Sequence, residues 1–146
     1  MIQAPLIVLI VDDEKDFVEM LSQRMQDDGH VVRVAYNADE GLESLAEQEP
    51  DVVVLDIRMP GMDGIAALRK IRARHPLVEV VLLTGHGSAE TAVEGLKLGA
   101  YDYLQKPTKY EALLETLKAA RARKADQEER IRKAEARSLL RRSGDL

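Results

Sequence analysis

Residues 51–64 read DVVVLDIRMPGMDG, and the fold class follows from them. Val52–Leu55 is an unbroken apolar run, which is typical of a strand that is covered on both faces of a sheet. The run stops at Asp56, after which Pro60 and two glycines favour a loop. A short buried strand followed directly by a carboxylate and a loop indicates an α/β sheet, in which ligands bind at the carboxyl ends of the strands.

Four further strand candidates flank this stretch, and segments with helical spacing separate all of them. Together with Asp51–Asp56, the candidates are Leu6–Val11, Val31–Ala35, Val78–Thr84 and Tyr101–Gln105. Strict alternation of strands and helices predicts a parallel sheet with helices on both faces. We therefore predict an α/β fold of the flavodoxin-like, doubly wound class, with a five-stranded parallel sheet.

Strand composition also predicts the order of the strands in this sheet. The first, third and fourth candidates are unbroken apolar runs, as inner strands should be. Arg33 interrupts the second and Asp102 the fifth, so these two should lie at the edges. The order 2-1-3-4-5 satisfies this pattern, and its topological switch point lies between the first and third strands.

Apolar stripes and capping residues predict where the helices run. The stripes are Phe17, Leu21, Met25 in the first helix and Ala89, Ala92, Val93, Leu96 in the fourth; the N-caps are Asn37 and Ser88, and the C-terminal glycines are Gly29 and Gly99.

The C-terminal part of the chain differs in charge from the rest. Residues 1–120 carry 12 Lys or Arg and 21 Asp or Glu, a net charge of −9, whereas residues 121–146 carry 9 and 5, a net charge of +4. An acidic body argues against direct nucleic-acid binding by that body. Because residues 109–142 contain neither Gly nor Pro, we predict one helix about 50 Å long. We place the domain boundary near residue 120, with residues 121–146 as a charged helical extension or linker.

Composition excludes several classes of protein. The chain has no cysteine, which excludes disulfides, thiolate nucleophiles and cysteine zinc sites. The longest apolar run, Leu6–Val11, is far too short to span a bilayer. We therefore expect a cytoplasmic protein with no membrane partner.

Carboxylates follow two strands that should be neighbours in the sheet. Asp12 and Asp13 come after the first strand and Asp56 after the third. Two carboxylates about 4 Å apart repel by roughly 4 kcal/mol at an effective dielectric constant of 20. A bound proton or a cation must therefore offset this repulsion. Oxygen ligands without His or Cys favour Mg²⁺. Thr84 and Lys106 end the next two strands, and with the cation they would form a clamp that suits a phosphoryl group.

These residues, with the segment LDIRMPGMDG, resemble the receiver domain of two-component response regulators over about residues 5–120. The resemblance implies that Asp56 accepts a phosphoryl group from a sensor histidine kinase. It implies that Asp13, Asp56 and the carbonyl of Arg58 bind Mg²⁺, with Asp12 assisting. The other implied roles are phosphoryl contacts for Thr84 and Lys106, a switch role for Thr84 and Tyr103, and a cis peptide bond before Pro107.

Such a chain would be a signalling domain rather than an enzyme, and two other enzyme or cofactor classes fit less well. A flavodoxin-like cofactor protein needs a phosphate loop where this chain has Asp12, Asp13 and Glu14. A haloacid-dehalogenase-type phosphatase needs a second Asp where this chain has Arg58. The alternative that stays open is a degenerate receiver that acts as a phosphorylation-independent interaction module.

The output of the switch is a separate question. The segments around Asp56 and Thr84 resemble receivers of nitrogen-regulation-type activators, which implies control of an output domain or partner protein in transcription. The final helix carries a heptad seam that is too weak for a stable coiled coil by itself and suits a switchable homodimer. The seam positions are Leu117, Ala120, Lys124, Gln127, Ile131, Ala134 and Ser138.

Overall fold

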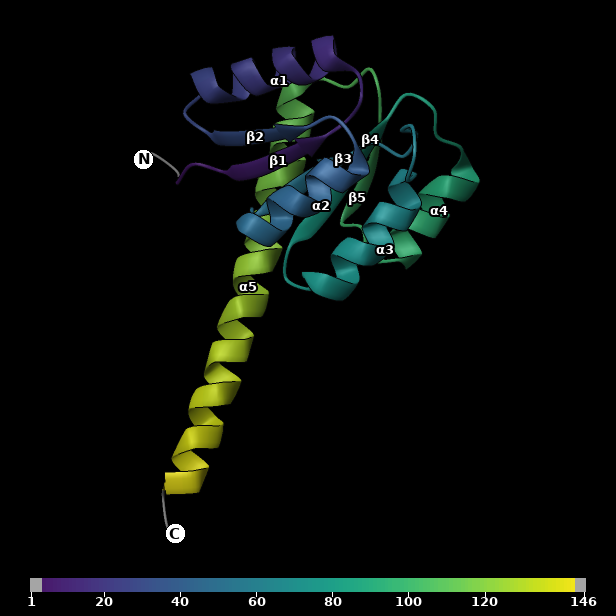
Figure 1. Ribbon diagram of the computed structural model, residues 1–146. Helices are drawn as coiled ribbons and strands as arrows, with labels where there is room; N and C mark the ends of the chain where they lie inside the picture. Colours follow the sequence, from purple (N-terminus) through teal and green to yellow (C-terminus); the bar gives the residue numbers. More distant parts are fainter. Residues whose placement is uncertain (1–3, 144–146) are drawn as a thin grey trace.

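In the computed structural model, which describes residues 4–143, strands and helices alternate along the whole chain (Figure 1). In chain order the elements are β1 (Ile7–Val11), α1 (Lys15–Asp27), β2 (Val31–Ala35), α2 (Ala38–Glu47), β3 (Val52–Leu55), α3 (Gly64–Arg74), β4 (Glu79–Thr84), α4 (Ala89–Lys97), β5 (Asp102–Gln105) and α5 (Tyr110–Ser143). The strands form one parallel sheet in the order β2-β1-β3-β4-β5. The predicted fold class and strand order are confirmed.

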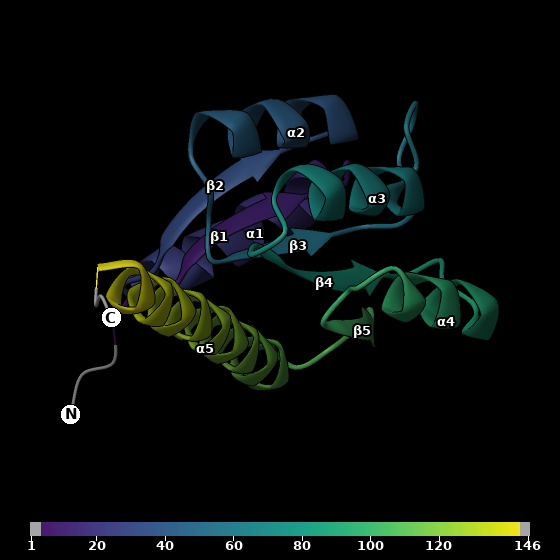
Figure 2. The same ribbon diagram turned by 90° about the horizontal axis from the view of Figure 1, so that it is seen from below.

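The helices cover both faces of the sheet, so the core has two halves. Figure 2 shows α2, α3 and α4 on one face, with α5 on the other. Alternate residues of a strand therefore enter different halves. In β1, Leu9 and Val11 pack with α2 and α3, whereas Val8 and Ile10 pack with α1 and α5. All strand residues of β3 and β4 are buried, which is why Val52–Leu55 and the central residues 80–83 of β4 are apolar without alternation.

The predicted caps fix several helix ends. The side chain of Asn37 accepts a hydrogen bond from the Glu40 N–H at 2.9 Å at the start of α2. Ser88 forms a capping box with Thr91 at the start of α4. Gly29 and Gly99 both have positive φ just beyond α1 and α4, as predicted for glycines at helix ends.

The predicted stripe of α4 is not a core stripe. Val93 is 51% exposed and Leu96 is 46% exposed, and the residue of α4 that is buried is Gly95. A Cβ at Gly95 would lie 2.4 Å from the side chain of Leu82 in β4. The helix therefore contacts the sheet through its smallest residue, and much of its apolar stripe faces outward.

The C-terminal helix projects far beyond the sheet, as predicted (Figure 1). The predicted heptad seam, however, does not begin where the sequence placed it. Leu117 and Ala120 are fully buried in this chain's own core, and Lys124 pairs with Asp51 at 3.5 Å. These positions are therefore not free for a second helix, and only the seam positions beyond Lys124 are available. Within the described residues, none of the helices is both long and apolar enough to cross a membrane.

Candidate functional site

Four polar side chains gather at the carboxyl-terminal edge of the sheet, where the strands end. Asp12 follows β1, Asp56 follows β3, Thr84 ends β4 and Lys106 follows β5. Parallel strands all end at one edge, so residues that are far apart in sequence meet there. Asp12, Asp56 and Thr84 are buried even though they are polar, which is costly unless each group finds a partner.

Three carboxylates form a cluster at this edge. Oxygen atoms of Asp12, Asp13 and Asp56 lie within 4.8 Å of one another, and Asp13 is exposed while the other two are buried. The Asp56 Oδ1 accepts a hydrogen bond from the Arg58 N–H at 3.3 Å. The Asp56 Oδ2 is buried and has no hydrogen-bond partner within residues 4–143. A buried carboxylate oxygen without a partner leaves room for a ligand that supplies positive charge.

Lys106 is the cation of the site. Its Nζ lies 2.7 Å from Asp12 Oδ2, 3.3 Å from Glu14 Oε1 and 3.9 Å from Asp56 Oδ2. Burial alone would lower the pKa of Lys106, but the hydrogen bond to Asp12 and the charges of Asp12 and Asp56 outweigh it and raise the pKa. Burial raises the pKa of Asp12, although Lys106 opposes this. The ammonium group therefore stays charged and faces two buried carboxylates.

Thr84 and Tyr103 lie together beside the cluster. The Thr84 hydroxyl accepts a hydrogen bond from the His86 N–H at 3.1 Å. The Tyr103 ring packs against the core from the edge strand β5, and its hydroxyl is buried with no hydrogen-bond partner in the described part of the chain. The peptide bond between Lys106 and Pro107 is cis. The structure thus brings every one of the predicted site residues to one edge of the sheet, with the Arg58 side chain exposed beside them.

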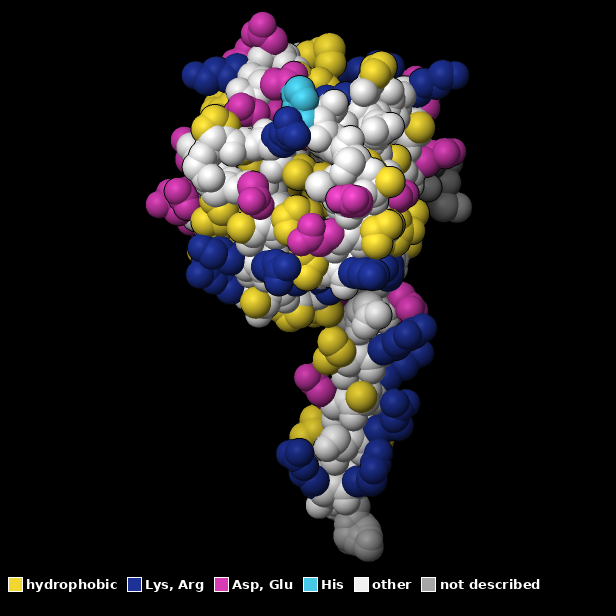
Figure 3. Space-filling view, turned by 90° about the vertical axis from the view of Figure 1, so that its right-hand side faces the viewer, with side chains coloured by type: hydrophobic (Ala, Val, Ile, Leu, Met, Phe, Trp, Pro, Cys, Tyr) yellow, Lys and Arg dark blue, Asp and Glu magenta, His cyan; other side chains and the backbone are white. Residues whose placement is uncertain are grey.

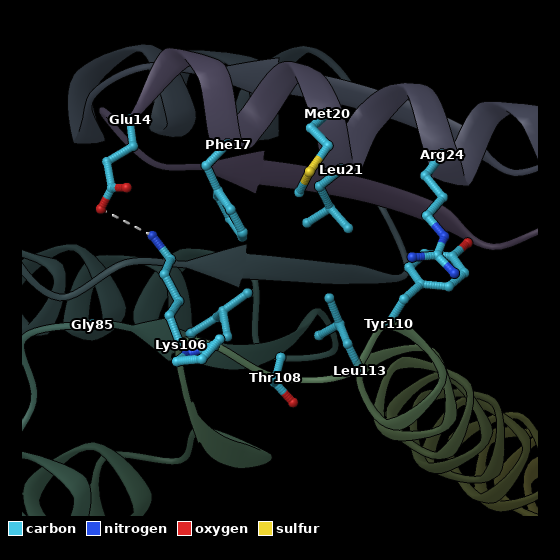
Figure 4. Close-up of a pocket in the computed structure, with 12 residues that line it drawn as sticks. Glu14, Phe17, Met20, Leu21, Arg24, Gly85, Lys106, Thr108, Tyr110 and Leu113 are labelled. Carbon is cyan, nitrogen blue, oxygen red and sulfur yellow. Dashed lines mark hydrogen bonds and ion pairs between the residues drawn. The ribbon is translucent and has the colours of Figure 1, made fainter.

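Glu14, which the sequence did not mark as a site residue, also belongs to this edge of the sheet. The side chain of Glu14 is the second carboxylate partner of Lys106, and Figure 4 shows this contact at one end of a groove. The available signal was the run Asp12-Asp13-Glu14, because three successive acids after a buried strand need more than one cation.

An apolar groove of about 490 Å³ starts at Lys106 and runs between α1 and the beginning of α5. Figure 4 shows Phe17, Met20 and Leu21 of α1 on one side and Tyr110 and Leu113 on the other. Met20 is exposed, and the guanidinium of Arg24 lies 4.0 Å from the centre of the Tyr110 ring. An apolar surface therefore borders the polar site directly.

The donor set fits a hard divalent cation. The side chains of the cluster are all carboxylates, with no His or Cys among them, and the carbonyl of Arg58 is a further oxygen candidate; Mg²⁺ prefers oxygen ligands while retaining several waters. The partly exposed position of the cluster leaves room for such waters, since Asp13 reaches solvent. The Asp56 Oδ2 without a partner is the atom that such a cation would satisfy.

Comparisons with known proteins agree with this geometry. The family model described as "Response regulator receiver domain" matches residues 8–118. A putative NtrX-like response regulator of Rickettsia bellii is 44% identical over 115 residues, which cover 77% of this chain and 24% of that protein. The DNA-binding transcriptional regulator NtrC of Escherichia coli is 43% identical over 101 residues, covering 69% of this chain and 22% of that protein.

A solved structure gives the same result. NtrX of Brucella abortus superposes with a TM-score of 0.80 at 36% identity, covering 86% of this chain and 29% of that one. The chain thus spans about a quarter of the length of the curated relatives that it matches.

Proposed function

We propose, because this chain belongs to the response regulator receiver family, that Asp56 is its phosphoryl acceptor and that the surrounding residues serve that transfer. Receivers of this family are signalling domains, and this one is of the NtrX and NtrC type. The single observation that carries the assignment is the Asp56 Oδ2. This oxygen is buried, accepts no hydrogen bond from any described residue, and lies 3.9 Å from the Lys106 Nζ.

The acceptor step follows from this arrangement. A carboxylate oxygen of Asp56 attacks the phosphorus of a phosphohistidine on a partner kinase. The new O–P bond replaces the P–N bond, and the histidine nitrogen leaves with the electron pair and takes up a proton. Negative charge spreads over the phosphoryl oxygens during the transfer, and fixed donors at this point stabilise it. Lys106 and the hydroxyl of Thr84 are the donors that this chain supplies.

We infer that Asp12, Asp13 and Asp56, with the carbonyl of Arg58, hold Mg²⁺ at this site. When bound, the ion would supply positive charge that offsets the repulsion between these carboxylates and stabilises the charge of the transferring phosphoryl group. Asp13 is the exposed member of the cluster, so a ligand there would keep contact with solvent water.

The partner kinase must bring its phosphohistidine to Asp56, and we propose that it does so over the apolar groove beside Lys106. That groove offers a protein partner buried apolar area next to the reacting group. Exposed Met20 at its border is the residue that such a partner would cover.

Mass spectrometry after incubation with acetyl phosphate and Mg²⁺ tests the acceptor. We expect one added phosphoryl group on the wild-type chain, none on Asp56→Asn, and none in the presence of EDTA. Asp63→Asn is the matched control, because Asp63 caps α3 through its side-chain oxygen and an asparagine can still do so. Full labelling of Asp56→Asn would refute the acceptor. Failure of the wild-type chain to accept any phosphoryl group would instead favour the degenerate interaction module.

We propose that the switch controls an output domain or partner through a homodimer, in transcriptional regulation. The supporting features are the outward apolar residues of α4, the edge strand β5 and the projecting α5, which carries Lys and Arg side chains along its length (Figure 3). We expect beryllofluoride, a phosphoryl mimic, to change the sedimentation of the chain at fixed concentration. Ile131→Asp, on the exposed part of the seam, should reduce that change. Identical sedimentation with and without beryllofluoride would refute the dimer switch.

The domain boundary near residue 120 also stays a proposal, since contacts of α5 with the sheet continue to Lys124.

A further inference from the structure

Gly64, the first residue of α3, is buried directly against the backbone that carries Asp56. A Cβ added at Gly64 would lie 2.2 Å from the carbonyl oxygen of Asp56 and 2.5 Å from the Cα of Ile57. Both are main-chain atoms, which cannot turn aside as the end of a long side chain can. The φ of Gly64 is not in the left-handed region. Residue 64 is therefore restricted to glycine by this contact, and its own backbone conformation would admit other residues.

The same glycine closes the loop that follows β3. The N–H of Gly64 donates a hydrogen bond to the carbonyl oxygen of Ile57 at 2.6 Å. Residues 58–63 thus form a loop whose two ends are joined by this hydrogen bond. At the start of the loop, the Arg58 N–H donates to the Asp56 Oδ1 at 3.3 Å. The peptide groups on both sides of the Ile57–Arg58 bond are thereby tied to fixed partners.

Side chains of the loop hold its remaining residues in place. Ile57 and Met59 are buried, and Met62 packs against the half of the core under α2, α3 and α4. Asp63 caps α3 by accepting a backbone hydrogen bond at 2.8 Å. Arg58 is the exposed residue between the buried Ile57 and Met59. Its main chain is therefore held by its neighbours and by the loop closure, although its side chain is free in solvent.

A main-chain ligand depends on such support more than a carboxylate does. The side chains of Asp12, Asp13 and Asp56 can rotate toward an ion, whereas a backbone carbonyl moves only with the path of the chain. Protein interiors are close-packed, so a displacement at the contact between Gly64 and Asp56 would be passed to the loop. The carbonyl of Arg58 is the candidate ligand that such a displacement would move.

We propose that Gly64 is a positioning residue for the Mg²⁺ site. Its missing side chain lets α3 begin against the backbone of Asp56 and Ile57, and the resulting loop closure sets the place of the Arg58 carbonyl. The inference rests on the proposed function, because it takes that carbonyl as a ligand of Mg²⁺.

Nitrogen-15 NMR of the full chain during titration with MgCl₂ tests the proposal without any phosphoryl donor. In the wild type we expect saturable shifts of the Asp13 and Arg58 amide resonances. Gly64→Ala should bind Mg²⁺ about 10-fold more weakly or worse, which is typical when a residue that orients a metal ligand is changed. Urea unfolding in EDTA shows how much of the variant is folded.

Gly95→Ala is the matched control. Gly95 is also a buried glycine of a helix, and a Cβ there would lie 2.4 Å from the Cδ1 of Leu82 in β4. This variant crowds the core as well, but it should bind Mg²⁺ with wild-type affinity. Wild-type affinity in Gly64→Ala would overturn the proposal, as would equal losses of affinity in the two variants.

Amide hydrogen exchange of the wild-type chain keeps the test decisive if Gly64→Ala does not fold. If loop closure favours Mg²⁺ binding, Mg²⁺ must favour loop closure by the same factor. Saturating Mg²⁺ should therefore slow exchange of the Gly64 N–H. The His75 N–H, which donates to the Ile71 carbonyl at 2.7 Å at the other end of α3, should keep its rate. An unchanged rate at Gly64, or equal slowing at both residues, would overturn the proposal.

The titration also separates this inference from the metal site on which it rests. A wild-type chain without Mg²⁺-dependent shifts would refute the Mg²⁺ site and the role of Gly64 together. Saturable binding that is equally tight in wild type and Gly64→Ala would refute the role of Gly64 alone and leave the Mg²⁺ site standing.

Discussion

A carboxylate is buried at each of the two edges of the sheet, and the two carboxylates differ in how fully they are hydrogen-bonded. At the amino-terminal edge, Glu79 is 4% exposed. The guanidinium of Arg123 donates a hydrogen bond to each of its carboxylate oxygens, with an Nη2–Oε1 distance of 2.7 Å. At the carboxyl-terminal edge, Asp56 is 1% exposed, and its Oδ2 has no hydrogen-bond partner among the described residues and only the ammonium of Lys106 at 3.9 Å. Stability explains the first arrangement, because a buried charge is tolerated when it is paired and hydrogen-bonded. The second arrangement fits the proposed role of Asp56 as a phosphoryl acceptor, because it leaves one carboxylate oxygen without a hydrogen bond among the described residues.

Other groups at the amino-terminal edge are satisfied in the same way. The Asp51 Oδ2 accepts a hydrogen bond from the Ile7 N–H at 3.1 Å, and Lys124 pairs with its other oxygen. The Nδ1 of His30 accepts a hydrogen bond from the Leu6 N–H at 3.0 Å. Polar residues at this edge form hydrogen bonds and ion pairs that hold the strands and the helix α5 together. At the other edge, one oxygen of Asp56 makes no hydrogen bond with the described residues. Substitutions at the two edges should therefore separate function from stability.

The largest effect is expected at the site cation. Lys106→Met should slow labelling by acetyl phosphate about 100-fold, as is typical when one donor to developing negative charge is removed. The rate of mass gain in the presence of saturating Mg²⁺ measures this. Lys109→Met, which removes an exposed lysine nearby, should label at the wild-type rate. A wild-type rate for Lys106→Met would show that the two edges do not differ in the way described.

The next effect belongs to the opposite edge. Arg123→Ala should lower the free energy of unfolding by about 2 kcal/mol, because Glu79 then stays buried with only Arg72 at 3.9 Å. The expected loss is below the usual cost of breaking a fully buried pair, since the side chain of Arg123 is itself 43% exposed. Labelling of Asp56 should be unchanged.

Arg130 supplies the control for this change. It pairs with Asp126 at 3.1 Å on the solvated part of α5, and Arg130→Ala should cost no more than about 0.5 kcal/mol. Urea unfolding curves compare the two. Equal decreases in the free energy of unfolding for Arg123→Ala and Arg130→Ala would mean that the buried pair of Arg123 with Glu79 stabilises the fold no more than an exposed pair does.

The smallest effect concerns pH. Burial lowers the pKa of His30, and the positive charge of Lys118 adds to this. The unfolded chain then binds a proton more readily than the folded chain, so the contribution of His30 to stability is present above about pH 6.5 and is lost as the pH falls through its lowered pKa. His30→Asn keeps an acceptor near Leu6 but cannot titrate, so stability should fall less steeply between pH 7 and pH 5. Parallel stability curves for the two proteins would contradict this.

The sequence predicted the sheet well because burial leaves a strong compositional mark. Inner strands need apolar residues on both faces, so Val52–Leu55 contains nothing else, and the polar interruptions Arg33 and Asp102 mark the two edge strands. The residues at the carboxyl-terminal edge were equally predictable from the sequence. Parallel strands bring their ends together, so Asp12 and Asp56 had to meet once the strand order was known.

The contacts at the amino-terminal edge could not be predicted from the sequence in the same way. Arg123 lies in a charged stretch that reads as solvated helix surface, and nothing local shows that its partner is Glu79, 44 residues earlier. The outward stripe of α4 failed for a related reason. Helical spacing identifies a face, but Gly95 decides which face reaches the sheet, and a glycine carries no apolar signal.

The pairing of α5 with the amino-terminal edge has a consequence for how far a small rearrangement travels. Lys124 is the last residue of the helix with an ion pair to the sheet in the described chain, and the helix continues to Ser143. Those 19 further residues extend about 28 Å at the rise of an α-helix. A tilt of about 10° at Lys124 would therefore displace the far end by about 5 Å, roughly the pitch of one helical turn. For such a tilt the helix would serve as a lever arm that pivots at the edge of the sheet opposite Asp56.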